Sequence, residues 1–434
     1  MVRTGAALAV LLVVAGAGGY WLYQRLDNNI QAAGIDSKIG EGRSANLSPG
    51  AKNILVVGSD SRDGDNAKYG KGLTTMQSDT LMVLHIAANR EWAAVVSLPR
   101  DSWLQIPACD RGNGTTSAPH HFKINEAFAI GGTTGDIGSA AACTIKTIEQ
   151  NTGLRIDHFL SVDFQGFKGM VDALDGIEVC PKQAIHDTKA HLDLEAGCQT
   201  VKGEQALGYV RTRYSVGDGS DIGRIGRQQE FMQALAAKAQ DKLTSPGDLY
   251  SFLDSATKSL TTDETLAGIK SLTSLASSLK DIPEDRLIFL TVPNYPRELD
   301  VPTDKANISW QYPQAHTLFT SLAKDREVDK DELTAAEPVP ARTITVQVLN
   351  GTGTPGQAAT AAKELRAAGY TVTGTGNAPV PAKETTVTYP SGLQEQAKAL
   401  AARLRTPATP RQDPQAAPGA VTLTVGPGYP GLRG

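Results

Sequence analysis

The segment SDTLMVLHIAANREWAAVVSLPRD, residues 78–101, decides the fold class. Its two apolar runs, TLMVLHI (80–86) and WAAVVSLP (92–99), are rich in aliphatic residues and predict two strands. A short polar turn at residues 88–90 joins them. A further run nearby, NILVVG (53–58), is too continuously apolar for an edge strand, so we expect these strands in a mainly buried sheet.

Further strands and helices alternate along the chain around this segment. NILVVG (53–58) and IDHFLSVDF (156–164) predict two more strands. Helices are predicted at residues 123–132, 141–153 and 167–176, each ending in glycine, and at 225–243, which is long and amphipathic. This alternation predicts the α/β class, an α-β-α sandwich around a mixed, mainly buried central sheet.

The length of 434 residues exceeds what one ordinary core accommodates, so more than one domain is expected. EVDKDELTAAEPVPAR is charged and then Pro-rich, as is typical of a linker. After it, strands and helices follow in the order β-α-β-β-α-β and predict a small α+β domain. The expected division is an anchor (1–23), a stalk (24–50), the main α/β domain (51–326), a linker (327–342), a C-terminal domain (343–427) and a disordered tail (428–434).

The N-terminus carries an uncharged apolar run at residues 5–23. As a helix it would span roughly 28 Å, close to the roughly 30 Å of a bilayer's hydrocarbon layer. Tyr20, Trp21 and Tyr23 would lie at the outer interface. We therefore expect a single-pass cell-membrane protein whose C-terminal bulk is extracellular. A cleaved signal peptide is the alternative, because residues 15–17 read Ala-Gly-Ala, which imitates a cleavage site.

The chain has four cysteines, Cys109, Cys143, Cys180 and Cys198, and none lies in a C-x-x-C spacing. An even number in an exported protein predicts two disulfides. Four cysteines allow three pairings, of which the most local, Cys109–Cys143 with Cys180–Cys198, is expected. Free thiols in a reducing compartment are the alternative.

Arginines are concentrated in RTRYSVGDGSDIGRIGRQQEF, residues 211–231. The cluster comprises Arg211, Arg213, Arg224 and Arg227, with Asp218 and Asp221 between them. The whole chain has a net charge of −4, which argues against general nucleic-acid binding. The positive charge is therefore local, and it indicates either a phosphate site or internal salt bridges to the two aspartates.

The spacing within this run favours a bound anion. Arg211 and Arg213 would point the same way if their segment is extended. Arg224 and Gln228 lie four residues apart at the start of a predicted helix, hence on one face. Guanidinium groups bind phosphate oxygens in a bidentate manner, and a helix start adds N–H donors. The run therefore suits a diphosphate.

Aspartates lie at the ends of the predicted strands. Asp60 follows the first strand, Asp79 precedes the second, and Arg100 with Asp101 follows the third. Ligands of α/β proteins bind at strand ends, where polar loops meet. One or two carboxylates together with phosphate oxygens suit Mg²⁺, with Mn²⁺ in its place as an option. Taken singly, an aspartate in a G-S-D turn is more often a turn former than a metal ligand.

These motifs together resemble one known family. G-S-D-S-R, S-D-T-L-M-V-L-H-I, S-L-P-R-D, K-I-N-E-A-F and R-T-R-Y…D…R-I-G-R-Q-Q occur in this order over roughly residues 50–325. The sequence resembles an actinobacterial member of the LytR–CpsA–Psr family, with a LytR-type C-terminal domain that begins at V-L-N-G. Many members carry arginine two residues before the S-D-T aspartate, where this chain has Gln77.

The resemblance implies a transferase of cell-wall biogenesis. Its members move a glycopolymer from a polyprenyl-pyrophosphate carrier to a peptidoglycan hydroxyl, typically C6 of N-acetylmuramic acid. By matching motifs, Asp60 and Asp79 would hold Mg²⁺. The pyrophosphate would be bound by Arg100, Arg211, Arg213, Arg224 and Gln228, with Arg227 in the same catalytic cluster.

Several roles stay open from the residues alone. Asp101 is the first choice as general base, with Asp218 and Asp221 as rivals, and Lys123 is an outer phosphate contact or a solvated lysine. A polyprenyl tail requires an apolar tunnel, which Phe159, Phe164, Phe167 and Met170 would line unless they are ordinary core.

Other functions compete with transfer. A polyprenyl-pyrophosphate pyrophosphatase would use the same site, and a carrier-lipid binder or regulator would need no turnover. The G-T-G-T-P-G run at 351–356 imitates a dinucleotide fingerprint but lacks the acidic residue that should follow. His186 and His191 are spaced for an exposed polar hairpin rather than for a metal site.

Overall fold

The computed structural model describes residues 20–59, 76, 78–212, 221–242 and 245–433. Most of the predicted anchor lies outside this range, and so do Asp60 and Arg213. Within it the chain is helical at 20–29, where Tyr20, Trp21 and Tyr23 are exposed. No helix of the described residues is both long and apolar enough to cross a membrane.

A seven-stranded sheet forms the centre of the main domain. Its order is β1 (Gln31–Ala33), β12 (Leu260–Asp263), β7 (His158–Val162), β2 (Lys52–Ser59), β3 (Ser78–Ile86), β4 (Ala93–Leu98) and β13 (Leu287–Thr291). The sheet is mixed, because β2 pairs in parallel with β7 and antiparallel with β3. The strands predicted from apolar runs are β2, β3, β4 and β7, and they occupy the middle of the sheet.

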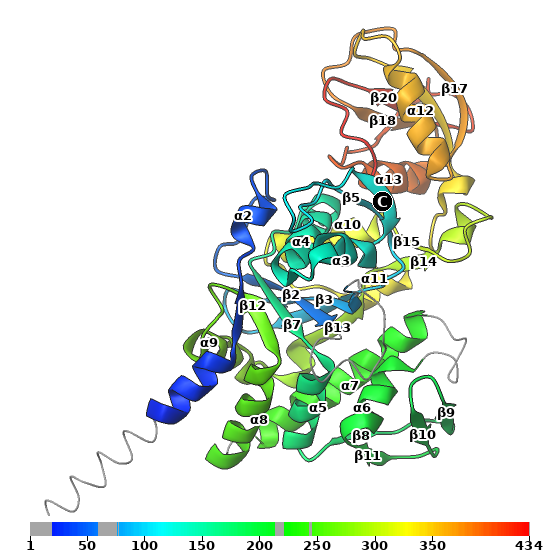
Figure 1. The fold of residues 1–434 in the computed structure, drawn as a ribbon. Helices are drawn as coiled ribbons and strands as arrows, with labels where there is room; N and C mark the ends of the chain where they lie inside the picture. The colour runs from blue at the N-terminus through cyan, green and yellow to red at the C-terminus, as the bar shows by residue number, and fades with distance from the viewer. Residues whose placement is uncertain (1–19, 60–75, 77, 213–220, 243–244, 434) are drawn as a thin grey trace, which may run out of the picture.

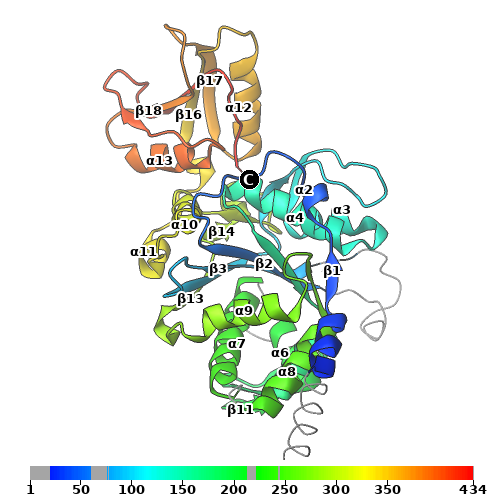
Figure 2. The same cartoon turned by 90° about the vertical axis from the view of Figure 1, so that its left-hand side faces the viewer.

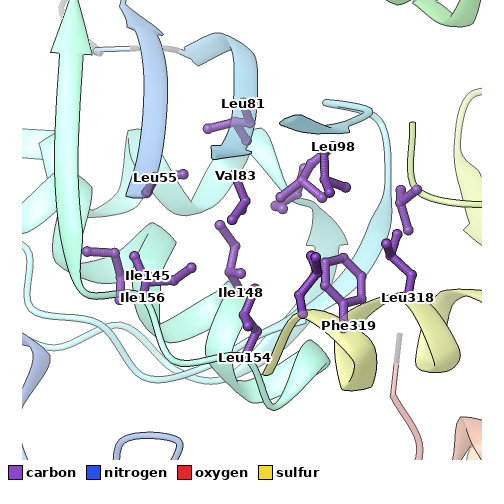
Figure 3. Close-up of a cluster of buried hydrophobic side chains, with 14 of the residues drawn as sticks. Leu55, Leu81, Val83, Leu98, Ile145, Ile148, Leu154, Ile156, Leu318 and Phe319 are labelled. Carbon is purple, nitrogen blue, oxygen red and sulfur yellow. The ribbon is translucent and has the colours of Figure 1, made fainter. Parts of the chain in front are cut away.

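Helices cover both faces of this sheet (Figures 1 and 2). One face carries α3 (Asn125–Gly131), α4 (Ile137–Thr152) and α10 (Gln314–Ala323), and the other carries α5 (Phe164–Ala173), α6 (Gly203–Arg211), α7 (Asp221–Lys242), α8 (Pro246–Lys258) and α9 (Ile269–Lys280). The predicted α-β-α sandwich is confirmed. Between the sheet and the first group lies the main core, where Leu55 and Val83 face Ile145, Ile148 and Phe319 (Figure 3).

Four two-stranded sheets lie outside the central sheet among the described residues. They are β5 (Trp103–Ile106) with β6 (His120–Lys123), β8 (Ile177–Val179) with β11 (Gln199–Val201), β9 (Ile185–Asp187) with β10 (Leu192–Leu194), and β14 (Asn294–Pro296) with β15 (Ile308–Trp310). The predicted disulfides are confirmed: Cys109–Cys143 connects the chain after β5 to α4, and Cys180–Cys198 joins the ends of β8 and β11.

The predicted stalk at 24–50 is wrong, because part of it belongs to the folded domain. Gln31 pairs with Thr261, which makes β1 the edge strand of the central sheet. Ile35 and Ile39, beside α2 (Asp36–Ile39), are buried in the main core. Because the residues around these isoleucines are mainly polar, the sequence does not indicate that Ile35 and Ile39 are part of the core.

The predictions of an unstructured linker at 327–342 and of a disordered tail at 428–434 are also wrong. α11 (Lys330–Ala335) lies within 327–342, and its Leu333 is buried in the main core. In the tail, Leu432 bridges to Leu404 and is buried. The guanidinium of Arg433 donates to the carbonyl of Asn151 at 2.6 Å, on the main domain. Both segments therefore join the two domains rather than separate them.

The C-terminal domain has the predicted β-α-β-β-α-β order. Its elements are β16 (Thr345–Asn350), α12 (Gln357–Ala367), β17 (Thr371–Asn377), β18 (Thr386–Tyr389), α13 (Gln394–Arg403), β19 (Arg411–Gln412) and β20 (Val421–Val425), with sheet order β17-β16-β20-β18-β19. A Cβ added to Gly351 would lie 2.5 Å from Cβ of Ala382. This glycine of the G-T-G-T-P-G run is thus required for loop packing.

A buried polar interface connects the domains. The Asp300 carboxylate, 2% exposed, accepts hydrogen bonds from Tyr295 Oη at 3.0 Å, Ser309 Oγ at 2.6 Å and the N–H of Ala341 at 2.6 Å. Arg403, on α13, places Nη1 3.8 Å from the same carboxylate. Figure 1 shows the C-terminal domain on the side of α3, α4 and α10, away from α5 and α8.

Candidate active site

A cavity of about 420 Å³ opens between the second face of the sheet and helices α5, α6 and α7. Its apolar walls come from the sheet and from all three helices: Val56, Met82, Leu160, Val162, Phe164, Phe167, Met170, Leu207, Val210, Met232 and Leu235. Phe164, Phe167 and Met170 therefore line it, which is the first of the two roles that the sequence left open for them. Phe159 does not, because successive side chains of β7 alternate and Phe159 points into the main core.

Charged and polar groups converge at one end of this cavity. The charged residues Asp79, Arg100, Arg211 and Arg224 and the neutral Gln228 all line it, although they come from β3, the end of β4, α6 and α7. The pairing of Leu81 with Leu98 brings the start of β3 to the end of β4, so Asp79 and Arg100 meet at one sheet edge. The structure thus brings these predicted site residues together.

Contacts between these groups hold the charged end in place. The Arg100 guanidinium is ion-paired with the Asp79 carboxylate. Nη2 of Arg224 donates to the Asp79 carbonyl at 2.8 Å, and Arg224 is 4% exposed. Gln228 donates to the Val210 carbonyl at 2.9 Å and to Thr80 Oγ1 at 3.2 Å. α7 is thereby attached to both β3 and α6.

The geometry of the first arginine differs from the prediction. Arg211 is the last residue of α6 and does not lie in an extended segment. Its guanidinium lies over the ring of Phe164, 4.6 Å from the centroid, as a cation–π contact. Arg224 and Gln228, in contrast, share one face of α7 as their spacing predicts.

Arg227 supports the site without lining the cavity formed by the described residues. Its Nη2 donates to the carbonyl of Thr212, directly after α6. Burial lowers the pKa of this guanidinium from its usual value. Arg227 thus fixes the end of α6, next to Arg211, rather than contacting a substrate in the cavity.

Asp101 and Lys123 form an ion pair beside the cavity, at 2.6 Å between Oδ1 and Nζ. The other carboxylate oxygen of Asp101 lies 3.8 Å from Nε of Arg100. Neither residue lines the cavity in the part of the chain that the structure describes. These contacts favour a positioning role for Asp101 over its predicted role as general base.

The predicted metal site lies only partly within the described residues. Asp79 faces the cavity, whereas Asp60 and also Arg213 and Gln77 lie outside the description. Ser59, the residue before Asp60, is paired with Ser78, the residue before Asp79. Among the residues that are described, no group of three or more His, Cys, Asp or Glu side chains gathers as a metal site.

Sequence reasoning missed three charged residues of the cavity wall, Asp163, Asp187 and Lys189. Asp163 caps α5 by accepting from the N–H of Gly166 at 2.8 Å. Asp187 and Lys189 belong to the predicted polar hairpin, which is confirmed as β9–β10. In that hairpin Nδ1 of His186 lies 2.5 Å from Asp193, on the exposed side. A signal for Asp163 was available, because an Asp directly before an apolar helix is typical of an N-cap.

Comparison with known proteins places this fold and site in a family. The profile of the LytR_cpsA_psr family matches residues 22–324. The chain belongs to this family. A second profile, LytR cell envelope-related transcriptional attenuator (LytR_C), matches residues 343–429, which are the C-terminal domain.

The names of three relatives of this LytR_cpsA_psr protein refer to cell-wall biosynthesis or to peptidoglycan. The probable cell wall biosynthesis protein LcpB of Corynebacterium glutamicum is 40% identical over 203 residues, which are 45% of this chain and 43% of LcpB. The match therefore spans less than half of the length of LcpB. The cell wall biosynthesis protein LcpA of the same organism is 28% identical, over 86% of this chain and 76% of LcpA. The polyisoprenyl-teichoic acid–peptidoglycan teichoic acid transferase TagT of Bacillus subtilis is 29% identical, over 55% and 70% of the two chains.

A solved structure supports the fold of the main domain. Protein gbs0355 of Streptococcus agalactiae superposes with a TM-score of 0.50 at 20% identity, covering 64% of this chain and 90% of that one. At this identity the likeness concerns the fold alone.

Proposed function

We propose that this protein is a phosphotransferase that moves a glycopolymer from a polyprenyl-pyrophosphate carrier to a hydroxyl group of peptidoglycan. One observation carries the proposal: an apolar cavity ends in a cluster of arginines. An isoprenoid tail suits the apolar part, and a diphosphate suits the guanidinium groups. The name of TagT, which includes polyisoprenyl, teichoic acid and peptidoglycan, supports the same donor and acceptor classes.

The proposed step exchanges one phosphorus–oxygen bond for another. The acceptor hydroxyl oxygen attacks the phosphorus that bears the glycan, and the bond from this phosphorus to the bridging oxygen breaks. Polyprenyl monophosphate leaves with the bridging oxygen, the hydroxyl proton passes to a base, and a phosphodiester joins glycan to peptidoglycan. Negative charge builds on the phosphoryl oxygens, so cations at fixed positions lower the barrier.

Arg100, Arg211 and Arg224 would supply most of this stabilisation. Each lines the cavity and is fixed by a neighbour: Arg100 by Asp79, Arg211 by Phe164, and Arg224 by the carbonyl of Asp79. Groups held in advance need no reorganisation when the charge develops. Gln228 would add a neutral contact. Asp101, which is ion-paired with Lys123, lies beside Arg100 and would help to orient it.

A divalent cation fits this donor set. Asp79 presents a carboxylate to the cavity, and Asp60 would add the second one. One or two carboxylates completed by phosphate oxygens and water are typical of Mg²⁺, with Mn²⁺ as a substitute. When bound, the ion would offset part of the diphosphate charge. Asp79 would then share its carboxylate between the ion and Arg100.

The proposed location is the cell membrane, and the N-terminal sequence supports it. The uncharged run at residues 5–23 would anchor the chain in the cell membrane, with the described domains on the extracellular side. Two disulfides suit that oxidising location. The cavity would then receive its carrier lipid from the same membrane.

The experiment that tests this function combines donor and acceptor. Purified chain is incubated with a polyprenyl-diphosphate-linked disaccharide, peptidoglycan oligomers and Mg²⁺, and products are read by mass spectrometry. Transfer yields polyprenyl monophosphate together with a peptidoglycan–phosphate–disaccharide. Release of disaccharide phosphate into water with acceptor present would identify a pyrophosphatase. Retention of lipid without any product would identify a carrier-lipid binder or regulator.

Filling the cavity should block the lipid. Met232 lines the cavity from α7, and Met232→Trp adds volume to the space that the tail would occupy. We expect binding of geranylgeranyl diphosphate to weaken at least about tenfold, or about 1.4 kcal/mol, by calorimetry. Gln233→Trp places the same side chain on an exposed position of α7 and serves as the control. Equal affinities in the two variants would show that the tail binds elsewhere.

A further inference from the structure

A disulfide-closed excursion, residues 181–197, forms an outer wall of the cavity. The segment connects β8 to β11, which form a two-stranded antiparallel sheet. Cys180 directly precedes it and Cys198 directly follows it, so the Cys180–Cys198 bond closes its base. Between these ends the chain folds into the β9–β10 hairpin. Its apolar side, Ile185, Leu192 and Leu194, packs into a core cluster shared with α5, α6 and α7.

The tip of this hairpin contacts α6 closely. Asp187, Lys189 and Ala190 all line the cavity. A Cβ added to Gly208 of α6 would lie 2.8 Å from the carbonyl oxygen of Ala190, so the glycine permits the approach. The hairpin therefore faces the arginine end of the site across a tight interface with α6.

Asp187 sets the position of the neighbouring lysine. Its Oδ1 accepts from the N–H groups of Lys189 and Ala190, both at 3.0 Å. Its Oδ2 accepts from Oγ1 of Thr212 at 2.6 Å in a buried contact. Thr212 directly follows Arg211, so one carboxylate fixes the backbone of Lys189 relative to the arginine segment.

Together these contacts place an exposed lysine on the wall of a cavity that is also lined by Arg211 and Arg224. We infer that Lys189 is a further donor-binding residue, which contacts the diphosphate of the lipid-linked donor, and that Asp187 is its positioning residue. This inference rests on the proposed function. An ammonium group is a compact point charge on a flexible stem, suited to a phosphate that enters or leaves. Lys189 would extend the cationic lining of the cavity from Arg224 and Arg211 to the β9–β10 hairpin.

The test uses Lys189→Gln in the full chain with geranylgeranyl diphosphate and geranylgeranyl monophosphate as probes. We expect the Kd for the diphosphate to rise about five- to tenfold and that for the monophosphate about twofold, by calorimetry at low salt. The difference should shrink at high salt, since an exposed charge is screened. In the transfer reaction the KM for the donor should rise, while kcat stays within about twofold.

Two further variants define the result. Lys189→Arg keeps the charge and should bind the diphosphate within about twofold of the native chain. Lys182→Gln removes an exposed lysine of the same excursion that does not line the described cavity, and should leave both Kd values unchanged. If Lys182→Gln weakens binding as much as Lys189→Gln, any lysine of this segment attracts the diphosphate through non-specific electrostatics. That result would overturn the inference.

Failure of this inference and of the proposed function are separable. If the native chain binds the diphosphate and Lys189→Gln binds it equally well, the role of Lys189 is overturned and the proposed function stands. If the native chain binds neither prenyl phosphate, both are overturned.

Discussion

Replacing Arg100 by alanine is expected to lower the transfer rate by about 10²–10³-fold, the cost of removing one preorganised donor from a site of developing negative charge. Arg100 lines the cavity and pairs with Asp79, so its loss removes a cation and leaves a carboxylate without this partner. Its side chain is 23% exposed, and truncation therefore leaves no closed void in the core. Steady-state kinetics with a lipid-linked disaccharide measures the effect.

Two variants control this experiment. Arg100→Lys keeps the charge but loses the guanidinium fork, and an intermediate rate is expected. Arg111→Ala removes an exposed arginine that does not line the described cavity and should leave the rate unchanged. A rate for Arg100→Ala within about threefold of the native rate would contradict the assignment of Arg100 to the reacting phosphate.

Replacing Asp300 by alanine is expected to destabilise the fold by about 3–5 kcal/mol, the usual cost of leaving a buried charge without its partner. Asp300 faces Arg403 across the interface between the domains, and both are buried. The same change removes the acceptor for Tyr295, Ser309 and the N–H of Ala341. The midpoint of urea unfolding should fall accordingly.

Matched variants separate the charge from the hydrogen bonds. Asp300→Asn keeps an acceptor but not the charge, and a smaller loss is expected. Asp281→Ala alters an exposed aspartate of the same domain and should change stability by less than about 0.5 kcal/mol. If Asp300→Ala costs no more than Asp281→Ala, the interface does not hold the two domains together.

The strands of the sheet centre were accessible from sequence because they are buried on both faces. β2, β3, β4 and β7 consist mainly of apolar residues, a composition that is typical of buried strands. The edge strand β1, Gln-Ala-Ala, carries a weaker pattern, and its partners lie more than two hundred residues away. Local composition at residues 24–50 therefore predicted a stalk where the fold has a strand.

The charged end of the site was largely accessible as well, through the motifs at strand ends and in α7. The geometry of this charged end could not be predicted from the sequence. The R-T-R spacing predicts two parallel side chains only if the backbone is extended, whereas α6 continues through Arg211. Whether Phe159 or Leu160 faces a cavity depends on which side of β7 is open, and both sides are apolar in sequence.

Residues from the hairpin were missed because they act through tertiary contacts. Asp187 and Lys189 read as part of a polar, exposed loop, and Lys189 is indeed exposed. Their place at the cavity depends on the close approach of Ala190 to Gly208. No local pattern encodes that approach.

The most direct measurement is a crystal structure of the full chain with geranylgeranyl diphosphate. We expect the isoprenoid chain to lie between Phe167 and Met232, with diphosphate oxygens within hydrogen-bond distance of Arg100 and Arg224. A diphosphate bound away from these guanidinium groups, or a lipid outside the cavity, would contradict this expectation.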